Sequence, residues 1–284
     1  MHMTFSHKAP VIRFATFLAP QLYPTYEHIA RYVGGKVGCP AGLTVGRSFE
    51  DFEAGRVDAG FICGLPYVRL ADAPGSPVEL LAAPVLQGER YRQKPVYFSD
   101  VIVRSDSPYT CFDDLSGCSW AYNEATSHSG YNLVCSSLLE RGKTLHYFGA
   151  MVKSGSHSRS LQLVLEGRAD ATAIDSHVFD VMCSQNKDLA LQLRVVTMLG
   201  PSSIPPVVVA RSLDPGLKCR VREALLAMHE DPDMARVLHE GRIDHFVAVK
   251  DTDYNDIRSI FARTQAAMVD EQGQFKSQHA RIGQ

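Results

Sequence analysis

The stretch Ala125-Thr126-Ser127-His128-Ser129-Gly130-Tyr131 is the most informative part of this chain. Residues 119–123 before it alternate as a short strand does, and residues 133–142 after it have the spacing of an amphipathic helix that ends at a glycine. Hydroxyl groups and an imidazole therefore crowd the first turn of a helix, where unpaired N–H groups and the helix dipole favour an anion. The stretch predicts an anion-binding turn. A Ser or Thr cap without a ligand is the alternative.

A second turn of the same kind follows further along the chain. Residues 147–152 are typical of a strand, residues 154–159 read Ser-Gly-Ser-His-Ser-Arg, and helical spacing then continues to Gly167. In an open α/β sheet the loops that follow strands gather at the carboxyl edge, where ligands bind. We expect the two turns to lie side by side and to surround one anionic group.

The composition is that of an ordinary globular protein, with 284 residues, 45% of them hydrophobic and 21% charged. A net charge of −2 with scattered Lys and Arg argues against nucleic acid as a partner. No apolar run reaches the ~18 residues of a membrane span. The seven cysteines contain no CxxC pair, and residues 1–10 lack a signal-peptide pattern. These features favour buried thiols in a reducing compartment.

Segments typical of strands and helices alternate along the chain. Strands are expected at residues 11–19, 43–46, 58–63 and 78–85, with helices at residues 26–33 and 49–54. This alternation predicts an α/β fold with mainly parallel sheets flanked by helices. Residues 96–104 and 206–211 are expected to be strands that cross between two lobes. We therefore predict a discontinuous first lobe of residues 1–103 and 201–284, hinged to a second lobe of residues 104–200.

Several short motifs occur in a characteristic order. They are Gly64-Leu65-Pro66-Tyr67, Tyr97 in the first crossing strand, Ser127-His128-Ser129-Gly130-Tyr131, Gly155-Ser156-His157, Gly167-Arg168-Ala169-Asp170 and Ile174-Asp175-Ser176. In this order and spacing the chain resembles the substrate-binding proteins of phosphonate, phosphite and phosphate ABC importers. The resemblance extends over about residues 11–249, and its specific part is residues 97–209.

The resemblance implies a type II periplasmic-binding-protein fold that clamps a small oxyanion between its lobes and delivers it to an ABC permease. It implies no catalytic residue, no metal and no cofactor, and a monomer is expected. The location would be periplasmic, with a cytoplasmic one as the alternative because no signal peptide is visible. The ligand-binding residues it implies are Ser127, His128, Ser129, His157, Asp175, Tyr67 and, from the first lobe, Tyr97.

Two departures from the family pattern bear on the ligand. His128 stands where the family usually has Thr, and an imidazole is bulkier and can be cationic below neutral pH. Members that bind aminoalkyl phosphonates place acidic residues near Asp175 and just after the returning Ile-Pro. Here Asp175 is present, but Pro205-Pro206 follows Ile204. A plain oxyanion or another organic acid is therefore expected in preference to an amine-bearing ligand.

Other chemistry is open to the same residues. Ser129, His157 and Asp175 could form a nucleophile, base and orienting group, although no nucleophile-elbow glycine pattern surrounds the serine. His157, Asp175 and His177 could ligate a metal, whereas a helix cap at Asp175 with His177 on the surface is the more ordinary interpretation. A cytoplasmic enzyme or a ligand sensor that reuses the fold is the alternative function.

Overall fold

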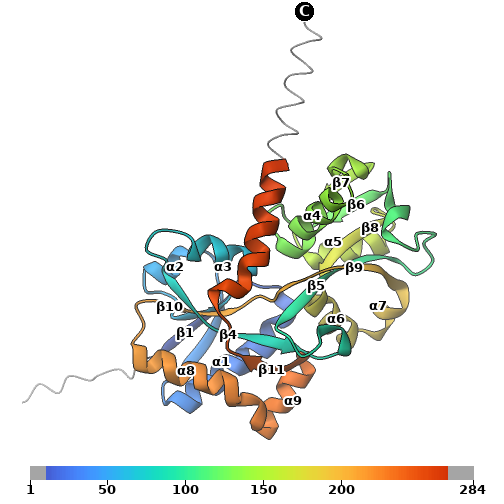
Figure 1. The fold of residues 1–284 in the computed structure, drawn as a ribbon. Coiled ribbons are helices and arrows are strands. Elements are labelled where there is room, and N and C mark those ends of the chain that lie inside the picture. The colour runs from blue at the N-terminus through green and yellow to red at the C-terminus, as the bar shows by residue number, and fades with distance from the viewer. Residues whose placement is uncertain (1–10, 268–284) are drawn as a thin grey trace, which may run out of the picture. The chain divides into compact units, whose positions relative to one another are not determined.

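The computed structural model describes residues 11–267, which fold as two compact α/β units (Figure 1). Among the described residues, unit 1 comprises residues 11–95 and Ile204–Asp251, and unit 2 comprises Val96–Ser203 and residues 252–267. No helix in residues 11–267 is long and apolar enough to cross a membrane. The expected α/β fold is confirmed, with mixed sheets rather than mainly parallel ones.

Unit 1 is built on a six-stranded sheet in the order β11-β4-β10-β3-β1-β2. Its strands are β1 (Ile12–Thr16), β2 (Ala41–Val45), β3 (Ala59–Phe61), β4 (Val78–Leu86), β10 (Val207–Ala210) and β11 (Ile243–Val247). Strand β1 is parallel to β2 and β3, whereas β10 lies antiparallel between β3 and β4, and β11 is antiparallel to β4. The sheet is mixed because β10 enters it from unit 2 instead of through a helical crossover.

The helices of unit 1 follow from apolar spacing and end signals. Helix α1 buries Tyr26, Ile29 and Val33 on one face and ends at Gly38, whose φ of 72° suits a residue without a Cβ. Helix α1 extends over Tyr23–Val37. The other helices are α2 (Glu50–Glu53), α3 (Gly64–Ala71), α8 (Pro215–Ala227) and α9 (Pro232–Glu240). Short 3-10 turns occur at η1 (Pro20–Leu22), η2 (Glu89–Tyr91) and η6 (Met228–Glu230).

Unit 2 is built on a five-stranded sheet in the order β7-β6-β8-β5-β9. The strands are β5 (Val96–Arg104), β6 (Ser119–Tyr122), β7 (Ala150–Lys153), β8 (Ala171–Asp175) and β9 (Leu193–Ser203). Strand β6 is parallel to both β7 and β8, and β5 is antiparallel to β8 and β9. The helical segments are η3 (Phe112–Leu115), η4 (His128–Asn132), α4 (Leu133–Glu140), η5 (Leu145–Tyr147), α5 (His157–Leu165), α6 (Ser176–Gln185), α7 (Lys187–Gln192), η7 (Asp251–Tyr254) at the unit boundary and a helix over residues 255–267.

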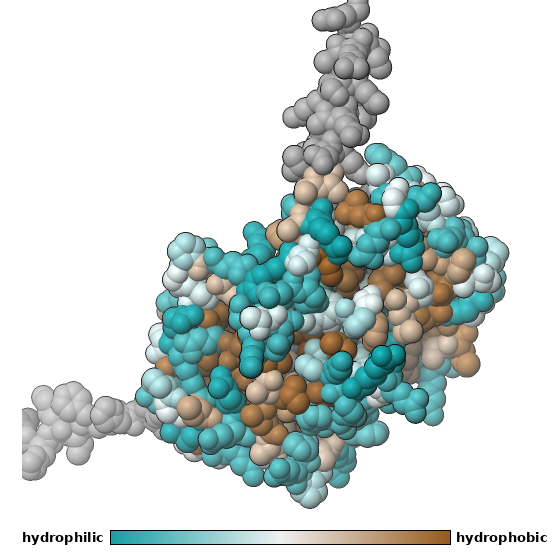
Figure 2. All heavy atoms as spheres, in the orientation of Figure 1, coloured by the Kyte–Doolittle hydropathy of each residue, from teal (hydrophilic) through white to brown (hydrophobic). Residues whose placement is uncertain are grey.

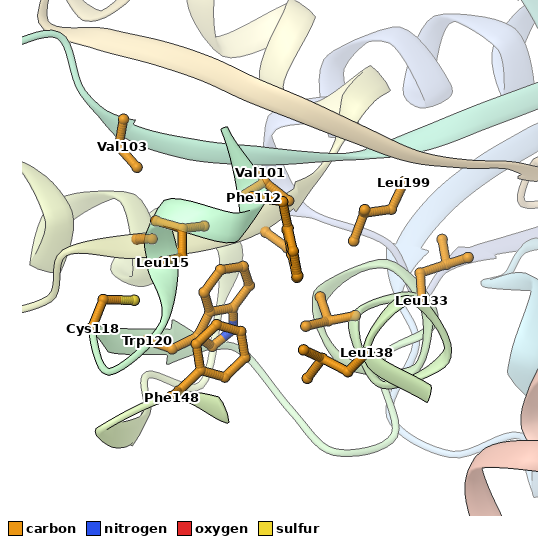
Figure 3. Packing of buried hydrophobic residues seen from close by; sticks show 13 residues of the cluster. Val101, Val103, Phe112, Leu115, Cys118, Trp120, Leu133, Leu138, Phe148 and Leu199 are labelled. Atoms are coloured by element: carbon orange, nitrogen blue, oxygen red, sulfur yellow. The ribbon is translucent and has the colours of Figure 1, made fainter. Parts of the chain in front are cut away.

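The core of unit 2 fixes α4 against the sheet. Trp120 of β6 is fully buried and stacks on Phe148, with ring centroids 4.4 Å apart. Leu133 and Leu138 of α4 lie in the same cluster (Figure 3). Burying a large apolar side chain contributes about 1.5–3 kcal/mol, so this cluster holds the helix, and the turn before it, in one position.

The second crossing strand expected at residues 206–211 is present as β10, whereas the chain just before it and the helix near the end of the described residues differ from the sequence expectation. Strand β9 begins at Leu193 and ends at Ser203 in unit 2, and the helix over residues 255–267 also belongs to unit 2 rather than to a lobe of residues 201–284. Ile257 of that helix is buried, and Asp256 binds the end of β9. Strand β9 is an edge strand in which both faces carry half-buried residues, so its sequence lacks the alternation of a strand with one buried and one exposed face.

Apolar side chains on the surface are scattered. Figure 2 shows polar residues (teal) over much of the visible face, with smaller brown areas between them. Large apolar side chains that are exposed in the described chain include Val11, Val45, Leu191 and Met198. Isolated residues of this kind are normal on the surface of a globular protein.

Candidate functional site

The turn after β6 begins a helix, as the sequence predicts. Ser127 is the N-cap, with extended backbone angles, and its Oγ accepts a hydrogen bond of 3.1 Å from the Gly130 N–H. The π-helical turn η4 then runs directly into α4. The first N–H groups of a helix have no acceptor within it. Because Ser127 takes up the Gly130 N–H, the N–H groups of His128 and Ser129 are left for another acceptor.

Gly130 allows the close packing of this turn. A Cβ at Gly130 would lie 2.0 Å from Oδ1 of Asn123, so only a residue without a side chain fits there. Asn123 Oδ1 is buried and has no hydrogen-bond partner among the described residues. Asn123 was not among the site residues predicted from the sequence. Its position just after the strand, before the hydroxyl-rich turn, is the signal that could have identified it.

The two predicted turns lie side by side. Strands β6 and β7 are parallel neighbours, and the Gly155 N–H after β7 donates to the Asn123 carbonyl after β6 at 3.0 Å. His157 is the first residue of α5, and its Nε2 lies 3.4 Å from Oγ of Ser129. Two helix N-termini therefore converge on one place, and their dipoles add there.

The His157 ring is a neutral group in this environment. Burial lowers the pKa of His157 well below its ordinary value of 6.5. Its Nδ1 atom is buried without a hydrogen-bond partner in the described part of the chain. A neutral imidazole has one N–H and one lone pair, so His157 can donate one hydrogen bond and accept another.

His128 is fully buried and points toward β9. Its Nε2 lies 2.9 Å from Oγ of Ser202, and that hydroxyl donates to Oδ2 of Asp256 at 2.5 Å. Burial lowers the pKa of His128 to about 4, with the nearby Asp256 acting in the opposite direction. His128 is therefore neutral around pH 7. The cationic form expected from the sequence just below neutral pH is not favoured.

Tyr97 lies close to the turn but belongs to unit 2. It is a buried residue of β5, and its ring centroid is 6.5 Å from that of His128. The expectation that Tyr97 approaches from the first lobe is therefore wrong. The whole of β5 hydrogen-bonds to β8 and β9, so the strand is part of the sheet in unit 2.

Asp175 caps the helix that follows β8. Its Oδ1 accepts hydrogen bonds from the N–H groups of His177 at 2.8 Å and Val178 at 3.3 Å. Burial raises the pKa of Asp175 to about 7, and the carboxylates of Asp100 and Asp180 act in the same direction. The expected cap is present, whereas the expected surface position of His177 is wrong, because this side chain is buried.

Tyr67 lies in unit 1, on α3, and is buried. Its hydroxyl donates to Oδ1 of Asp251 in the same unit at 2.6 Å. This hydrogen bond gives Tyr67 a structural role in unit 1. A ligand contact by Tyr67 stays a prediction.

The family of the chain follows from its sequence. Residues 14–254 match the family model of the ABC transporter, phosphonate, periplasmic substrate-binding protein. The chain belongs to this family. That family is one of transport proteins that bind a substrate in the periplasm. The hydroxyl-rich turns described above lie within the matched residues.

Solved structures with the same fold agree with this assignment. One is a binding protein component of an ABC phosphonate transporter from Pseudomonas aeruginosa, at 17% identity and a TM-score of 0.77, covering 97% of this chain and 100% of that chain. Another is PhnD1 from Prochlorococcus marinus in complex with methylphosphonate, at 14% identity and a TM-score of 0.73, covering 90% and 98%. A third, from Xanthomonas citri and bound to ATP, has 18% identity and a TM-score of 0.67, covering 90% and 97%. These likenesses show the type II periplasmic-binding-protein fold.

In this member of the phosphonate-binding family, Ser129, His157 and Asp175 do not form the Ser-His-Asp arrangement that the sequence left open. Ser129 and His157 are neighbours, but Nδ1 of His157 has no partner in the described chain, and Asp175 hydrogen-bonds to its own helix. A Ser-His-Asp arrangement needs the acid to orient the histidine. The described residues also contain no group of three or more His, Cys, Asp or Glu placed to hold a metal ion.

Proposed function

We propose that this chain captures a small oxyanion of the phosphonate or phosphate type at the converging N-termini of η4 and α5 and presents it to an ABC permease. The observation that carries this proposal is the 3.4 Å approach of Ser129 Oγ to His157 Nε2, which joins two hydroxyl-rich helix starts. Unpaired N–H groups and the positive ends of two dipoles favour an anion at this point. Membership of the phosphonate-binding family supports the same ligand class.

Each residue of the site has a proposed role. The hydroxyl of Ser127 accepts from Gly130 through its oxygen, which leaves its proton for a ligand oxygen. Ser129 and His157 supply further neutral donors, and the N–H groups of His128 and Ser129 complete the set. Tyr97 lies beside His128 and supplies a phenolic hydroxyl. Neutral donors held by a rigid helix start bind an anion strongly because each hydrogen bond is charge-assisted.

We further propose that the chain binds its ligand without converting it, acts as a monomer and works in the periplasm. The Asp175 carboxylate accepts hydrogen bonds from the start of α6. It therefore serves its own helix and does not orient His157 as the acid of a Ser-His-Asp arrangement would. Because this carboxylate is occupied by the helix start, it is a poor partner for a ligand ammonium group, which favours a plain oxyanion over an amine-bearing one. Clamping of the ligand between two lobes stays a prediction.

Calorimetric titration of the full chain with methylphosphonate, phosphate, sulfate and acetate tests the proposal. We expect one-to-one binding of a phosphorus oxyanion. The ligand should raise the free energy of unfolding by about 2.7 kcal/mol at 100 times Kd, and the melting temperature should rise with ligand concentration. Incubating the protein with the bound phosphonate and following the ligand by ³¹P NMR should show no product. A flat response to every anion at millimolar concentration would rule out the proposed site.

A further inference from the structure

The hydrogen bonds of His128 fix which ring nitrogen carries its proton. Asp256 accepts hydrogen bonds from Ser202 Oγ at 2.5 Å and from the Ser203 N–H at 2.9 Å, both on Oδ2, and from Ser203 Oγ at 2.8 Å on Oδ1. A carboxylate only accepts, so the single proton of Ser202 is directed at Asp256. The remaining contact of Ser202, to His128 Nε2 at 2.9 Å, must then be donated by the imidazole. His128 is held as the Nε2–H tautomer.

This tautomer leaves a lone pair on Nδ1 of His128. The atom is buried and has no hydrogen-bond partner among the described residues, and the side chain as a whole is inaccessible to solvent. A buried acceptor without a donor is costly, so such atoms call for an explanation. Nδ1 is the ring nitrogen bonded to Cγ, so it lies nearer to the backbone of residue 128 than Nε2, which reaches Ser202 on β9.

The chemistry required of a partner for Nδ1 is narrow. The partner has to donate a hydrogen bond, yet the N–H groups and hydroxyls of the same turn require an acceptor. A monoprotonated phosphorus oxyanion meets both demands because it carries one P–OH donor beside anionic oxygens. The second ionisation of such groups falls near neutrality, at about 6 for a phosphate ester, so this form is available in solution.

We propose that the site is selective for the protonated, monoanionic form of its ligand, whose P–OH donates to His128 Nδ1, and that Ser202 and Asp256 are the positioning residues that set this preference. The inference rests on the proposed function and adds the protonation state of the ligand to it. The imidazole stays neutral over the pH range in which the ligand loses its second proton, because burial lowers the pKa of His128 to about 4. Thr, the usual family residue at this position, both donates and accepts and would impose no such choice.

Other titratable groups lie on the elements around this turn, and their protonation has to be separated from that of the ligand. Those on the elements that carry or contact the turn include Tyr97, Asp100 and Arg104 on β5, Asp175 on β8, Cys135 and Glu140 on α4, His157 and Arg159 on α5, Arg194 on β9, and Asp256, Arg258 and Arg263 on the helix over residues 255–267. Of these, Asp175 titrates in the same range as the ligand, because burial raises its pKa to about 7. Measurements of proton uptake are therefore repeated in Asp175→Asn.

Two probes differ by the one group in question. Methylphosphonate at pH 6 and methanesulfonate have the same charge and nearly the same shape, but only the phosphonate carries a hydroxyl. We expect methylphosphonate to bind the wild-type protein about ten- to a hundredfold more tightly, the ratio that corresponds to an unpaired buried acceptor. At pH 8.5, calorimetry in two buffers of different ionisation enthalpy should show uptake of close to one proton per bound phosphonate, in wild type and in Asp175→Asn alike.

Neighbouring serines provide a matched pair of variants. Ser202→Ala removes the acceptor of Nε2–H and frees the ring to change tautomer, so the ratio of phosphonate to sulfonate affinity should fall toward 1. Ser203→Ala removes a hydroxyl that contacts the same carboxylate and the Asp253 carbonyl without touching His128, and its ratio should stay as in wild type. The ¹⁵N NMR shifts of the wild-type ring give a readout that needs no variant: the Nε2–H tautomer is expected, and an Nδ1–H tautomer or an imidazolium would overturn the inference.

The possible failures are distinguishable. Wild-type protein that binds neither probe between pH 5 and 9 would refute the proposed function and this inference with it. Binding of both probes with equal affinity, or binding of the phosphonate at pH 8.5 without proton uptake, would leave the oxyanion site in place and overturn only its selectivity for the protonated form.

Discussion

Oγ of Ser129 lies 3.4 Å from Nε2 of His157, a residue 28 positions further along the chain. Ser129 stands in the helix start after β6 and His157 in the helix start after β7, and these strands are parallel neighbours. The contact is therefore a direct consequence of the strand order. It brings the two hydroxyl-rich turns onto one ligand position, and the first predictions depend on it.

Ser129→Ala is expected to weaken binding of methylphosphonate by about ten- to a hundredfold, as measured by calorimetry. A hydrogen bond to a charged group contributes about 1.5–3 kcal/mol, and about 1.4 kcal/mol corresponds to tenfold in affinity. The hydroxyl caps no helix, but it is buried and contacts His157, so the free energy of unfolding should fall by about 0.5–1.5 kcal/mol. Ser184→Ala, which removes a hydroxyl bonded to the Val181 carbonyl, is the control and should bind as wild type. Equal affinity in Ser129→Ala would place the ligand elsewhere.

Ser127→Ala should differ from Ser129→Ala because Ser127 has two roles. Its oxygen caps η4 by accepting from Gly130, and loss of a cap costs about 1 kcal/mol of stability. Its proton is also a proposed ligand donor. We expect a lower melting temperature in the absence of ligand together with a loss of affinity comparable to that of Ser129→Ala.

The matched control for that variant is Asp214→Ala, which removes the cap of α8 in unit 1. It should lose a similar amount of stability and keep its affinity for methylphosphonate. A Ser127→Ala protein that is destabilised yet binds as wild type would show that the serine is a cap alone.

Local sequence patterns were sufficient to predict the two turns. Ser127 and Ser156 both cap helices that directly follow strands, and Asp175 caps a third, as the residue types suggest. These features are local, because a cap depends on the residue and the three or four positions after it. The fold class could be predicted for a similar reason, since alternation of strands and helices is visible along the chain.

Long-range relationships could not be predicted in this way. His128 is joined to Ser202, which lies 74 positions later, and through it to Asp256, and no local pattern links three such polar residues. Tyr97 was expected in the wrong unit because a crossing strand can belong to either sheet until its partners are known. The hydrogen bonds of β5 to β8 and β9 decide that question.

Gly130→Ala should destabilise the protein and reduce binding. The new Cβ would lie 2.0 Å from Asn123 Oδ1, so either the amide or the helix start has to move. Overpacking of this kind costs about 1–3 kcal/mol, and the displaced turn would no longer aim its N–H groups at the ligand. Gly35→Ala in α1, where nothing lies within 4 Å, is the control and should raise the free energy of unfolding, measured in urea, by up to about 1 kcal/mol. A Gly130→Ala protein as stable as wild type would show that Asn123 moves freely.

Asp175 makes the stability of the protein depend on pH in an unusual direction. Burial, with Asp100 and Asp180 nearby, raises its pKa from 3.8 to about 7, although two backbone N–H groups favour the carboxylate. Because the folded protein holds this proton more tightly than the unfolded chain, the protonated acid stabilises the fold at low pH. That contribution is complete below about pH 3.8 and is lost as the pH rises through about 7.

Asp175→Asn removes this dependence while keeping a side-chain oxygen as cap. We expect the variant to gain stability relative to wild type as the pH is raised from 5 to 8, and the difference to level off above about pH 7, measured by urea unfolding at each pH. Asp188→Asn, an exposed residue at the start of α7, is the control and should follow the wild-type curve. Affinity for methylphosphonate should change little in Asp175→Asn, because the carboxylate serves its own helix. A difference that is constant from pH 5 to 8 would mean that Asp175 is ionised throughout, and a collapse of affinity would instead indicate a ligand with a positively charged group.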